Sequence, residues 1–308
     1  MGASSTSDDD SQDISEGERL SSPLQVRSNG AKLETITQAL AYKGLIEQRK
    51  RPKRQRTSIN LDKIRAAIEE VAGKQPSDKK IWNSIQTKDI SMKGQELIFS
   101  IIHDTFFVGD KWKRENMPAE LYESASCHAP RCGDQEESMD HILTMCTAPG
   151  QNTIWDLAKE LWEMTGRQWP GTCLGKIMGC TVIDFSEGNN RADKLAAAGA
   201  NRLYKIIMAE SVQLIWAIRC ERVIGGKQHT EVEIHNRWLF RINKRLKLDQ
   251  ALTKKKSFGN RTIQEGTVTG TWKGTLANEN NLPKHWVWDP GVLVGIPPAI
   301  QRVHKEQG

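Results

Sequence analysis

The sequence contains no run of about 18 apolar residues, the length that a membrane-spanning helix requires. Its N-terminus, MGASSTSDDDSQDISEGE, is acidic and rich in serine, and it lacks the basic start and the apolar stretch of a secretory signal. We therefore expect an intracellular protein, in the nucleus or the cytoplasm, with no membrane partner. In a reducing compartment, clustered cysteines favour metal binding over disulfide formation.

Motifs of the common enzyme classes are also missing, since the chain has no G-x-S-x-G, no P-loop and no dinucleotide fingerprint. The adjacent acids Asp8, Asp9 and Asp10 lie in residues 1–30, which have too few large apolar residues to fold. Glu210 interrupts the apolar face of a long helix, and we expect it to pair with an arginine or lysine of a neighbouring helix. The sequence therefore predicts a protein that is not an enzyme.

Strand patterns are few and no internal repeat is present, whereas apolar residues recur at helical spacing through much of the chain. This periodicity predicts helices over residues 31–48, 60–72, 81–112, 153–166, 192–224 and 230–252. Asn60 is the expected N-cap of the second of them. Residues 271–298 have Gly and Pro too often for a long helix. The predicted fold class is mainly α.

One segment, CHAPRCGDQEESMDHILTMC at residues 127–146, contains three of the six cysteines and two of the seven histidines. Zinc prefers four nitrogen or sulfur ligands in a tetrahedron, and two closely spaced pairs supply them. Cys127 and Cys132 form a C-x4-C pair, and His141 and Cys146 form an H-x4-C pair. His128 is an alternative first ligand. The competing interpretation is a set of separate buried cysteines with an incidental histidine.

The spacing of the second pair constrains its local structure. On an ideal α-helix, positions 141 and 146 are about 140° out of line, so Cys146 must lie where a helix ends. Ser138 is a candidate N-cap of this helix, and Ile142, Leu143 and Met145 are expected to pack it onto the core. Four protein ligands close the coordination shell, whereas a catalytic zinc keeps a position open for water. The pattern therefore predicts a structural Zn²⁺.

Basic residues concentrate in RKRPKRQR, residues 49–56. This pattern is typical of a nuclear-import or nucleic-acid-binding segment, although a solvated basic linker has the same composition. A second basic set is expected on the outer face of helix 230–252. The candidate nucleic-acid-binding residues are Arg49, Lys50, Arg51, Lys53, Arg54, Arg56, Arg237, Arg241, Lys244 and Arg245.

The chain has ten tryptophans against three tyrosines and six phenylalanines. Indole rings can stack on unpaired bases, but Trp155, Trp162 and Trp238 lie in or beside apolar helix stripes and are expected in the core. Trp286 and Trp288 lie in the irregular C-terminal stretch. We expect those two to be freer, as anchors at the surface.

The segment ESMDHILTMC, followed by TAPGQNTIW, resembles the zinc-binding domain that follows reverse transcriptase in non-LTR retrotransposons. The fungal version also resembles KIWNSIQTKDIS before the cluster and RLYKIIMAESVQLIWAIRCERVIGG after it, so the resemblance runs from about residue 31 to 296. It implies zinc on Cys132, His141 and Cys146. Family members usually have C-x2-C where this chain has CHAPRC. The ribonuclease H and polymerase domains that often precede this region in the family are not visible here.

The sequence thus predicts a helical domain with a CCHC zinc knuckle, a disordered acidic N-terminal tail and an irregular C-terminal tail. The predicted divisions are 1–30 tail, 31–57 short helix and basic linker, 58–170 helical region with the knuckle, 171–252 long-helix region and 253–308 C-terminal tail. The expected function is non-catalytic, with structural zinc and RNA or DNA binding. The alternatives are a protein–protein adaptor or inert remnant, and a fragment that acts with a separate reverse transcriptase or ribonuclease H chain.

Overall fold

The structure is a computed structural model that describes residues 37–39, 42, 54–130, 132–186, 191–254, 259 and 262–299. The chain divides after Pro52 into two units, of which the second is Lys53–Gly308. The expected tail at 1–30, most of the expected helix 31–48, and Arg49, Lys50, Arg51 and Lys53 lie outside the described residues. The predicted domain divisions stay predictions.

The second unit is mainly helical, as the sequence predicts. Its described residues contain no β-strand, only isolated bridges that join Ser126 to Glu136 and Leu276 to Val294. Within the described ranges, no helix combines the length and the apolar composition needed to cross a membrane.

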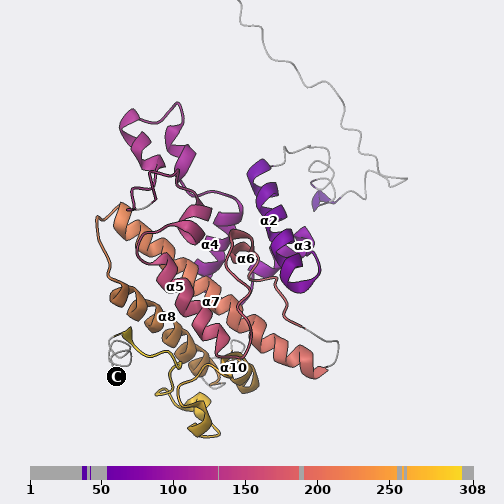
Figure 1. The fold of residues 1–308 in the computed structure, drawn as a ribbon. Coiled ribbons are helices and arrows are strands. Elements are labelled where there is room, and N and C mark those ends of the chain that lie inside the picture. The colour runs from indigo at the N-terminus through magenta and orange to yellow at the C-terminus, as the bar shows by residue number, and fades with distance from the viewer. Residues whose placement is uncertain are drawn as a thin grey trace, which may run out of the picture. The chain divides into compact units, whose positions relative to one another are not determined.

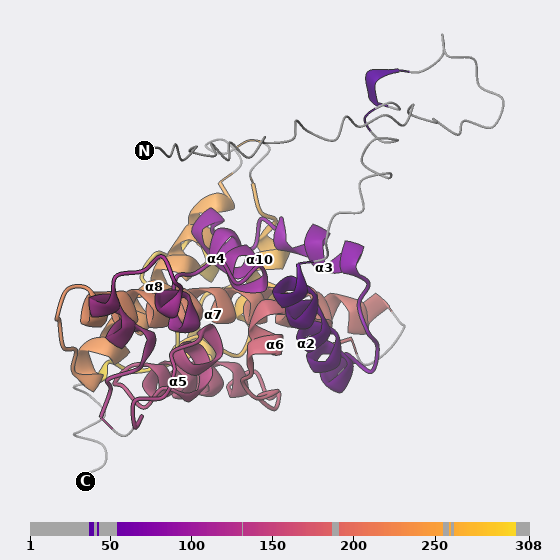
Figure 2. The same ribbon diagram turned by 90° about the horizontal axis from the view of Figure 1, so that it is seen from above.

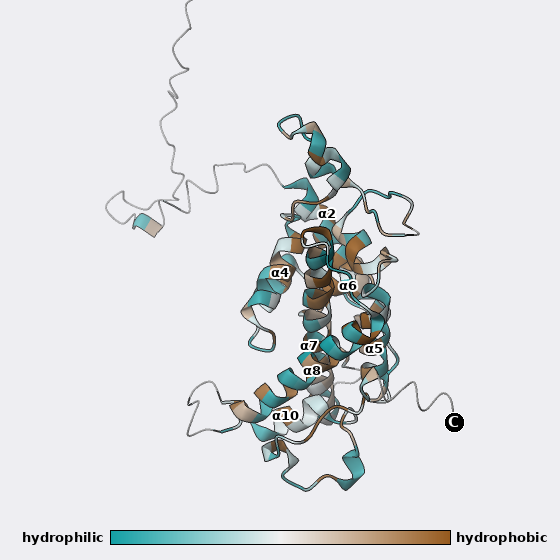
Figure 3. Ribbon diagram, turned by 90° about the vertical axis from the view of Figure 1, so that its left-hand side faces the viewer, coloured by the Kyte–Doolittle hydropathy of each residue, from teal (hydrophilic) through white to brown (hydrophobic). Residues whose placement is uncertain are grey.

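The long helix α7 (Arg191–Val223) packs against α5 (Gln151–Glu163) and α8 (Glu231–Leu252), which also contact each other (Figure 1). The predicted apolar face of α7 is buried, and Trp162 and Trp238 are buried beside it. Thr230 caps α8, because its hydroxyl accepts a hydrogen bond from the Glu233 amide. Hydrophobic residues lie along α6 and the middle of α7 (Figure 3). The predicted helices at 192–224 and 230–252 are therefore confirmed.

Four shorter helices cover one side of α7: α2 (Gln55–Ala72), α3 (Asp78–Ile85), α4 (Met92–Ile102) and α6 (Leu174–Met178). Helix α2 packs on α6, and α4 packs on both α6 and α7 (Figure 2). The prediction that Asn60 is the N-cap of this helix is wrong, because α2 begins at Gln55. The Asn60 amide instead donates to the Ile101 and Ile102 carbonyls at 3.2 and 3.1 Å. It therefore caps the end of α4, where carbonyls lack helical partners.

The predicted helical stretch 81–112 is divided into segments, because α3 ends at Ile85 and α4 starts again at Met92. The side chains of Ser77 and Ser91 are the N-caps of α3 and α4. Short 3-10 helices follow at Gly109–Lys113 and Ala119–Ala125. Hydrogen-bonding side chains at helix starts thus divide a segment whose apolar pattern is continuous.

The C-terminal region differs from the predicted irregular tail, since it contains helix α10 (Glu265–Trp272) and short 3-10 turns at Glu279–Asn281 and Trp286–Trp288. Gly199 of α7 lets α10 approach, because a Cβ at that position would lie 2.2 Å from the Gly270 carbonyl oxygen. Trp286 is buried, contrary to expectation, whereas Trp288 is 57% exposed. Packing on α7, not local periodicity, therefore explains α10.

A buried ion network links three of these helices. Asp249 of α8 is fully buried and accepts two hydrogen bonds from Arg202 of α7, at 2.6 and 2.8 Å, and one from the Trp272 indole of α10 at 2.9 Å. Arg202 also donates to Asp89, in the loop before α4, at 3.1 Å. Charges that are removed from water in this way must be paired and hydrogen-bonded, so the network fixes how α7, α8 and α10 meet.

Candidate metal centre

The structure brings together four of the residues that the sequence singled out. One ligand atom each from Cys127, Cys132, His141 and Cys146 lies within 4.8 Å of all the others. The Cys146 sulfur is 3.8 Å from the Cys127 sulfur and 4.0 Å from the Cys132 sulfur. A tetrahedral zinc with Zn–S bonds of about 2.3 Å separates its sulfurs by about 3.8 Å. The cluster has the ligand types and the spacing to bind a metal such as zinc.

The first pair lies on a tight hairpin. The Cys127 amide donates to the Gln135 carbonyl at 2.8 Å, and the Glu137 amide donates to the Ala125 carbonyl at 2.8 Å, so residues 125–137 fold back on themselves. Gly133 adopts a left-handed φ of 59° at the bend, where glycine carries no steric penalty. This hairpin turns Cys127 and Cys132 toward the second pair.

The second pair lies on a π-helical turn, His141–Met145. The Cys146 amide donates to the His141 carbonyl at 2.7 Å, which is the i to i−5 hydrogen bond of a π-helix. This wider turn brings Cys146 onto the same side as His141, whereas in an α-helix residues five positions apart point in different directions. Ser138 caps the turn by accepting from the His141 amide at 3.0 Å. The chain becomes extended at Cys146, so the expectation that the helix ends there is confirmed. Met145, expected in the core, is 51% exposed.

Backbone amides near the sulfurs favour their ionised form. Those of Ala129 and Ala148 act to lower the pKa of Cys127 and Cys146, against the larger effect of burial. The Thr147 amide donates to the Cys132 sulfur at 3.4 Å, and the Thr147 hydroxyl lies 3.1 Å from the same atom. Hydrogen bonds of this kind favour a thiolate, which is the form that binds metal.

Burial acts in the opposite direction on these thiols. It raises the pKa of Cys127 to about 12 and also raises the pKa of Cys146. At Cys132 burial again opposes ionisation, but the hydrogen bonds from Thr147 and the neighbouring thiols lower the pKa overall. A bound cation reverses the effect of burial, since a thiol that coordinates a metal is deprotonated. A bound positive ion would therefore favour the thiolate forms of Cys127 and Cys146, which burial alone disfavours.

His141 is suited to be the fourth ligand. Burial lowers the pKa of its imidazole, so the ring is neutral at pH 7 and has a lone pair to donate. Both ring nitrogens are buried and have no hydrogen-bond partner within the described part of the chain. A buried polar atom without a partner is costly, and a metal ion beside the three sulfurs would satisfy one of the two nitrogens.

His128 does not belong to the cluster. Its Nε2 lies 2.9 Å from the Glu123 carbonyl oxygen, its Nδ1 lies 3.3 Å from an Asp134 carboxylate oxygen, and the side chain is exposed. The tight hairpin turns the Cys127 sulfur inward and this imidazole outward. Of the two residues proposed for the first position, the structure therefore places Cys127 in the site.

A buried ion pair, which the sequence analysis did not find, links the metal centre to α7. The Arg219 Nε donates to a Glu137 carboxylate oxygen at 3.1 Å, and a second guanidinium nitrogen bonds the other oxygen. The two side chains are only 9% and 3% exposed. Glu137 lies four residues before His141, and its negative charge acts to raise the pKa of that imidazole, against the larger lowering by burial. No sequence feature marks this pair, because its partners are 82 positions apart.

The predicted basic face of α8 is largely neutralised within the protein. Arg237 donates to both carboxylate oxygens of Glu221 at 2.7 and 2.8 Å. Arg241 bonds Glu210, which confirms the expected structural role of that acid. Arg245, expected to point outward, is instead buried, because it donates to the Asp89 carbonyl and lies 3.4 Å from the Asp249 carboxylate.

Among the described residues of the predicted nucleic-acid-binding set, few lie outside these internal pairs. Of the α8 set, Lys244 is exposed. Within the 49–56 run, Arg54 is exposed, and Arg56 pairs with Asp104 and Asp110. These contacts shift the candidate phosphate-binding surface from α8 to the start of α2.

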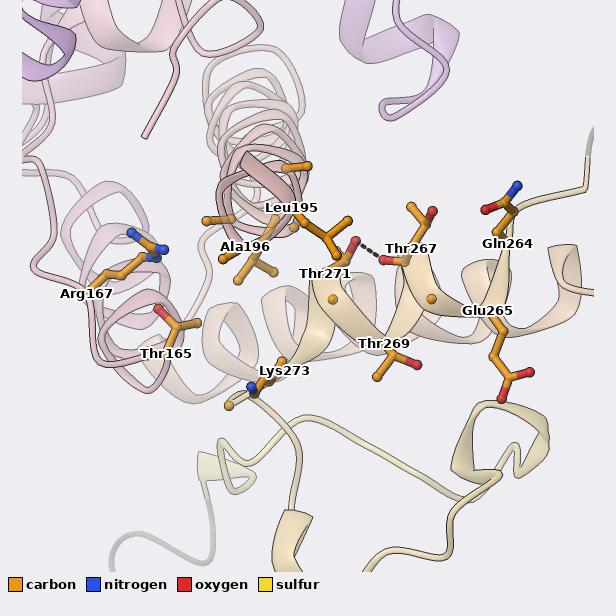
Figure 4. A pocket seen from close by; sticks show the side chains of 17 residues that line it. Thr165, Arg167, Leu195, Ala196, Gln264, Glu265, Thr267, Thr269, Thr271 and Lys273 are labelled. Carbon is orange, nitrogen blue, oxygen red and sulfur yellow. Dashed lines mark hydrogen bonds between the residues drawn. The ribbon is translucent and has the colours of Figure 1, made fainter. Parts of the chain in front are cut away.

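An open cavity of about 1040 Å³ lies between α7 and α10 (Figure 4). Leu195 and Ala196 of α7 form one wall, Thr267 and neighbouring residues of α10 form the other, and Arg167 lies near one end. Its lining contains no cysteine or histidine and does not adjoin the metal centre.

Comparisons of the chain with protein-family models, curated proteins and solved structures return no match.

Proposed function

We propose that this chain is a non-catalytic protein, derived from a non-LTR retrotransposon, that uses structural zinc and binds RNA or DNA. The closed set of three cysteines and one histidine supports the zinc assignment. Cys127 and Cys132 would hold the ion from the hairpin, and His141 and Cys146 from the π-helical turn. When bound, zinc would crosslink the hairpin, which has little apolar core of its own, to the turn, whose Ile142 and Leu143 pack in the main core.

The retroelement origin rests on the resemblance of residues 137–155 and their flanks to the zinc-binding domain downstream of reverse transcriptase. That resemblance also implies a natural partner, a separate chain with reverse transcriptase or ribonuclease H activity. No step of such a reaction is assigned to this chain.

Nucleic-acid binding rests on the run 49–56, in which six of eight side chains are cationic and none is acidic. Each phosphate contact releases counterions, so affinity for a single strand falls with salt by a slope of about −0.7 per contact. Because Arg56 already pairs with Asp104 and Asp110, the five other contacts predict a slope of roughly −3.5 in a plot of log K against log salt. Because the three arginines of α8 have internal partners, we assign the main contacts to this run and an auxiliary one to Lys244.

The experiment measures the binding of a fluorescein-labelled single-stranded oligo(U) to the zinc-loaded full chain across a salt series. One variant carries R49Q, K50Q and R51Q; a matched control removes three exposed positive charges elsewhere, by K159Q, K194Q and K273Q. The run variant should lose about two units of slope, and the control should lose less than one. No binding at low salt, or equal losses in the two variants, would refute the proposal.

A second candidate function is that of a protein–protein adaptor. It is favoured by the open cavity between α7 and α10 (Figure 4), whose lining includes the exposed Leu195, and by the internal pairing of the α8 arginines. This candidate predicts no salt-dependent binding to oligo(U). It also predicts that Leu195→Glu abolishes binding to a purified reverse transcriptase or ribonuclease H chain, measured by calorimetry.

A further inference from the structure

Three aromatic rings from two helices form a partly exposed cluster at the surface near α2. Trp82 of α3 stacks on His103, at the end of α4, with ring centroids 5.0 Å apart and an interplanar angle of 13°. Phe99 of α4 meets the His103 ring edge-on at 4.4 Å and lies 5.9 Å from Trp82. Phe99 is 48% exposed although it is a large apolar residue, so one face of the cluster is open to solvent.

The cluster lies at the end of the basic run. The Thr57 hydroxyl, one residue beyond Arg56, lies 3.1 Å from the His103 Nδ1. Burial, and then the positive charge of Arg54, lower the pKa of His103. The imidazole is therefore neutral at pH 7.

The described charges around the cluster are of both signs. Asp104, the acid next to His103, is paired with both Arg56 and Lys111. Exposed Lys79 lies one helical turn before Trp82, and exposed Glu96 lies one helical turn before Phe99, so Arg54 and Lys79 are the cations left to contact an anion on this face. Exposed aromatic rings beside cations are the combination that binds unpaired nucleotides, because the rings stack on bases while the cations contact phosphates.

We propose that Trp82, Phe99 and His103 form a stacking surface for an unpaired base of a nucleic acid whose adjoining phosphates contact Arg54 and Lys79. This inference rests on the proposed nucleic-acid-binding function and adds to it a preference for single strands over duplexes. Phe99 supplies the most exposed ring face, and Trp82 and Thr57 hold the neighbouring imidazole in place.

The chain contains a matched control for this site. Trp288 is also exposed and stacks on His285, with centroids 5.1 Å apart and an interplanar angle of 9°. Its histidine lies 3.8 Å from the Glu265 carboxylate, not beside a basic run. The two clusters thus share aromatic exposure but differ in the sign of the nearby charge, and only the first is expected to bind a nucleic acid.

The test measures the affinity of the zinc-loaded full chain for labelled oligo(U), oligo(dT) and a duplex of equal length. Phe99→Ala should weaken single-strand binding at least about fivefold, the lower end for loss of one stacked base, and leave duplex affinity and the salt slope unchanged. Phe99→Tyr should restore binding, and Trp288→Ala should have no effect. The oligo(U) and oligo(dT) titrations show whether the strand is RNA or DNA. Melting temperatures verify that each variant is folded.

Two results would overturn the proposal, and they are distinguishable. If the wild type binds with the predicted salt dependence but Phe99→Ala binds as tightly as Trp288→Ala, the stacking surface is wrong and the proposed function stands. If the wild type binds no strand at low salt, both fail.

Discussion

The substitution Glu137→Gln tests how the metal centre is attached to the helical core. It keeps the shape of the side chain but removes its charge, which leaves Arg219 of α7 buried without a carboxylate. Loss of one partner of a buried ion pair costs about 3–5 kcal/mol. Because the whole fold is stable by about 5–15 kcal/mol, this single change should remove about a fifth or more of the free energy of unfolding.

The same helix provides the control. Glu221 and Arg237 form a pair with the same two-bond geometry, but their side chains are 35% and 28% exposed. Water screens such a pair, so Glu221→Gln should cost at most about 1 kcal/mol at neutral pH. Urea unfolding of the zinc-loaded chain, followed by circular dichroism at 222 nm, gives both values by the established linear relation. Equal costs in the two variants would show that burial of the Glu137 pair does not link the metal centre to α7.

Two further predictions concern packing and pH. Gly199→Ala should destabilise the fold by about 1–3 kcal/mol through its clash with the Gly270 carbonyl, whereas Gly266→Ala on open α10 surface should be neutral or stabilising in the same urea assay. The Arg237 hydrogen bond lowers the pKa of Glu221 from 4.5 to about 2. The ion pair of Glu221 therefore stabilises the fold above pH 4.5, and this stabilisation is lost as the pH falls toward 2. The difference in free energy of unfolding between wild type and Glu221→Gln should shrink over that range, and a constant difference would contradict this.

The long helices were predictable, because apolar residues recur at helical spacing throughout α7 and α8. Three members of the cluster that could hold a metal, Cys132, His141 and Cys146, were predictable from residue type and spacing. Features that depend on distant partners were not. Asn60 is a good N-cap residue by type, but the end of α4 determines what its amide bonds. Arg245 has the periodicity of an outward residue, yet Asp249 and the Asp89 carbonyl draw it inward.

The same distinction holds for the remaining differences. Helix α10 has a sequence rich in threonine and glycine, with little apolar periodicity, and it forms where Gly199 permits close contact with α7. The π-helical turn of the metal centre is not visible in the sequence, although the five-residue spacing of His141 and Cys146 required some departure from an α-helix. The choice between Cys127 and His128 depended on the direction of a hairpin, which residue types alone do not determine.

Metal analysis of the purified full chain tests the central claim most directly. The wild type is compared with Cys132→Ala and His141→Ala, and with His128→Ala as the matched control, since His128 adjoins a ligand but lies outside the cluster. The account predicts one zinc per chain in the wild type and in His128→Ala, and its loss in the other two variants. A wild type without zinc, or zinc lost from His128→Ala, would contradict it.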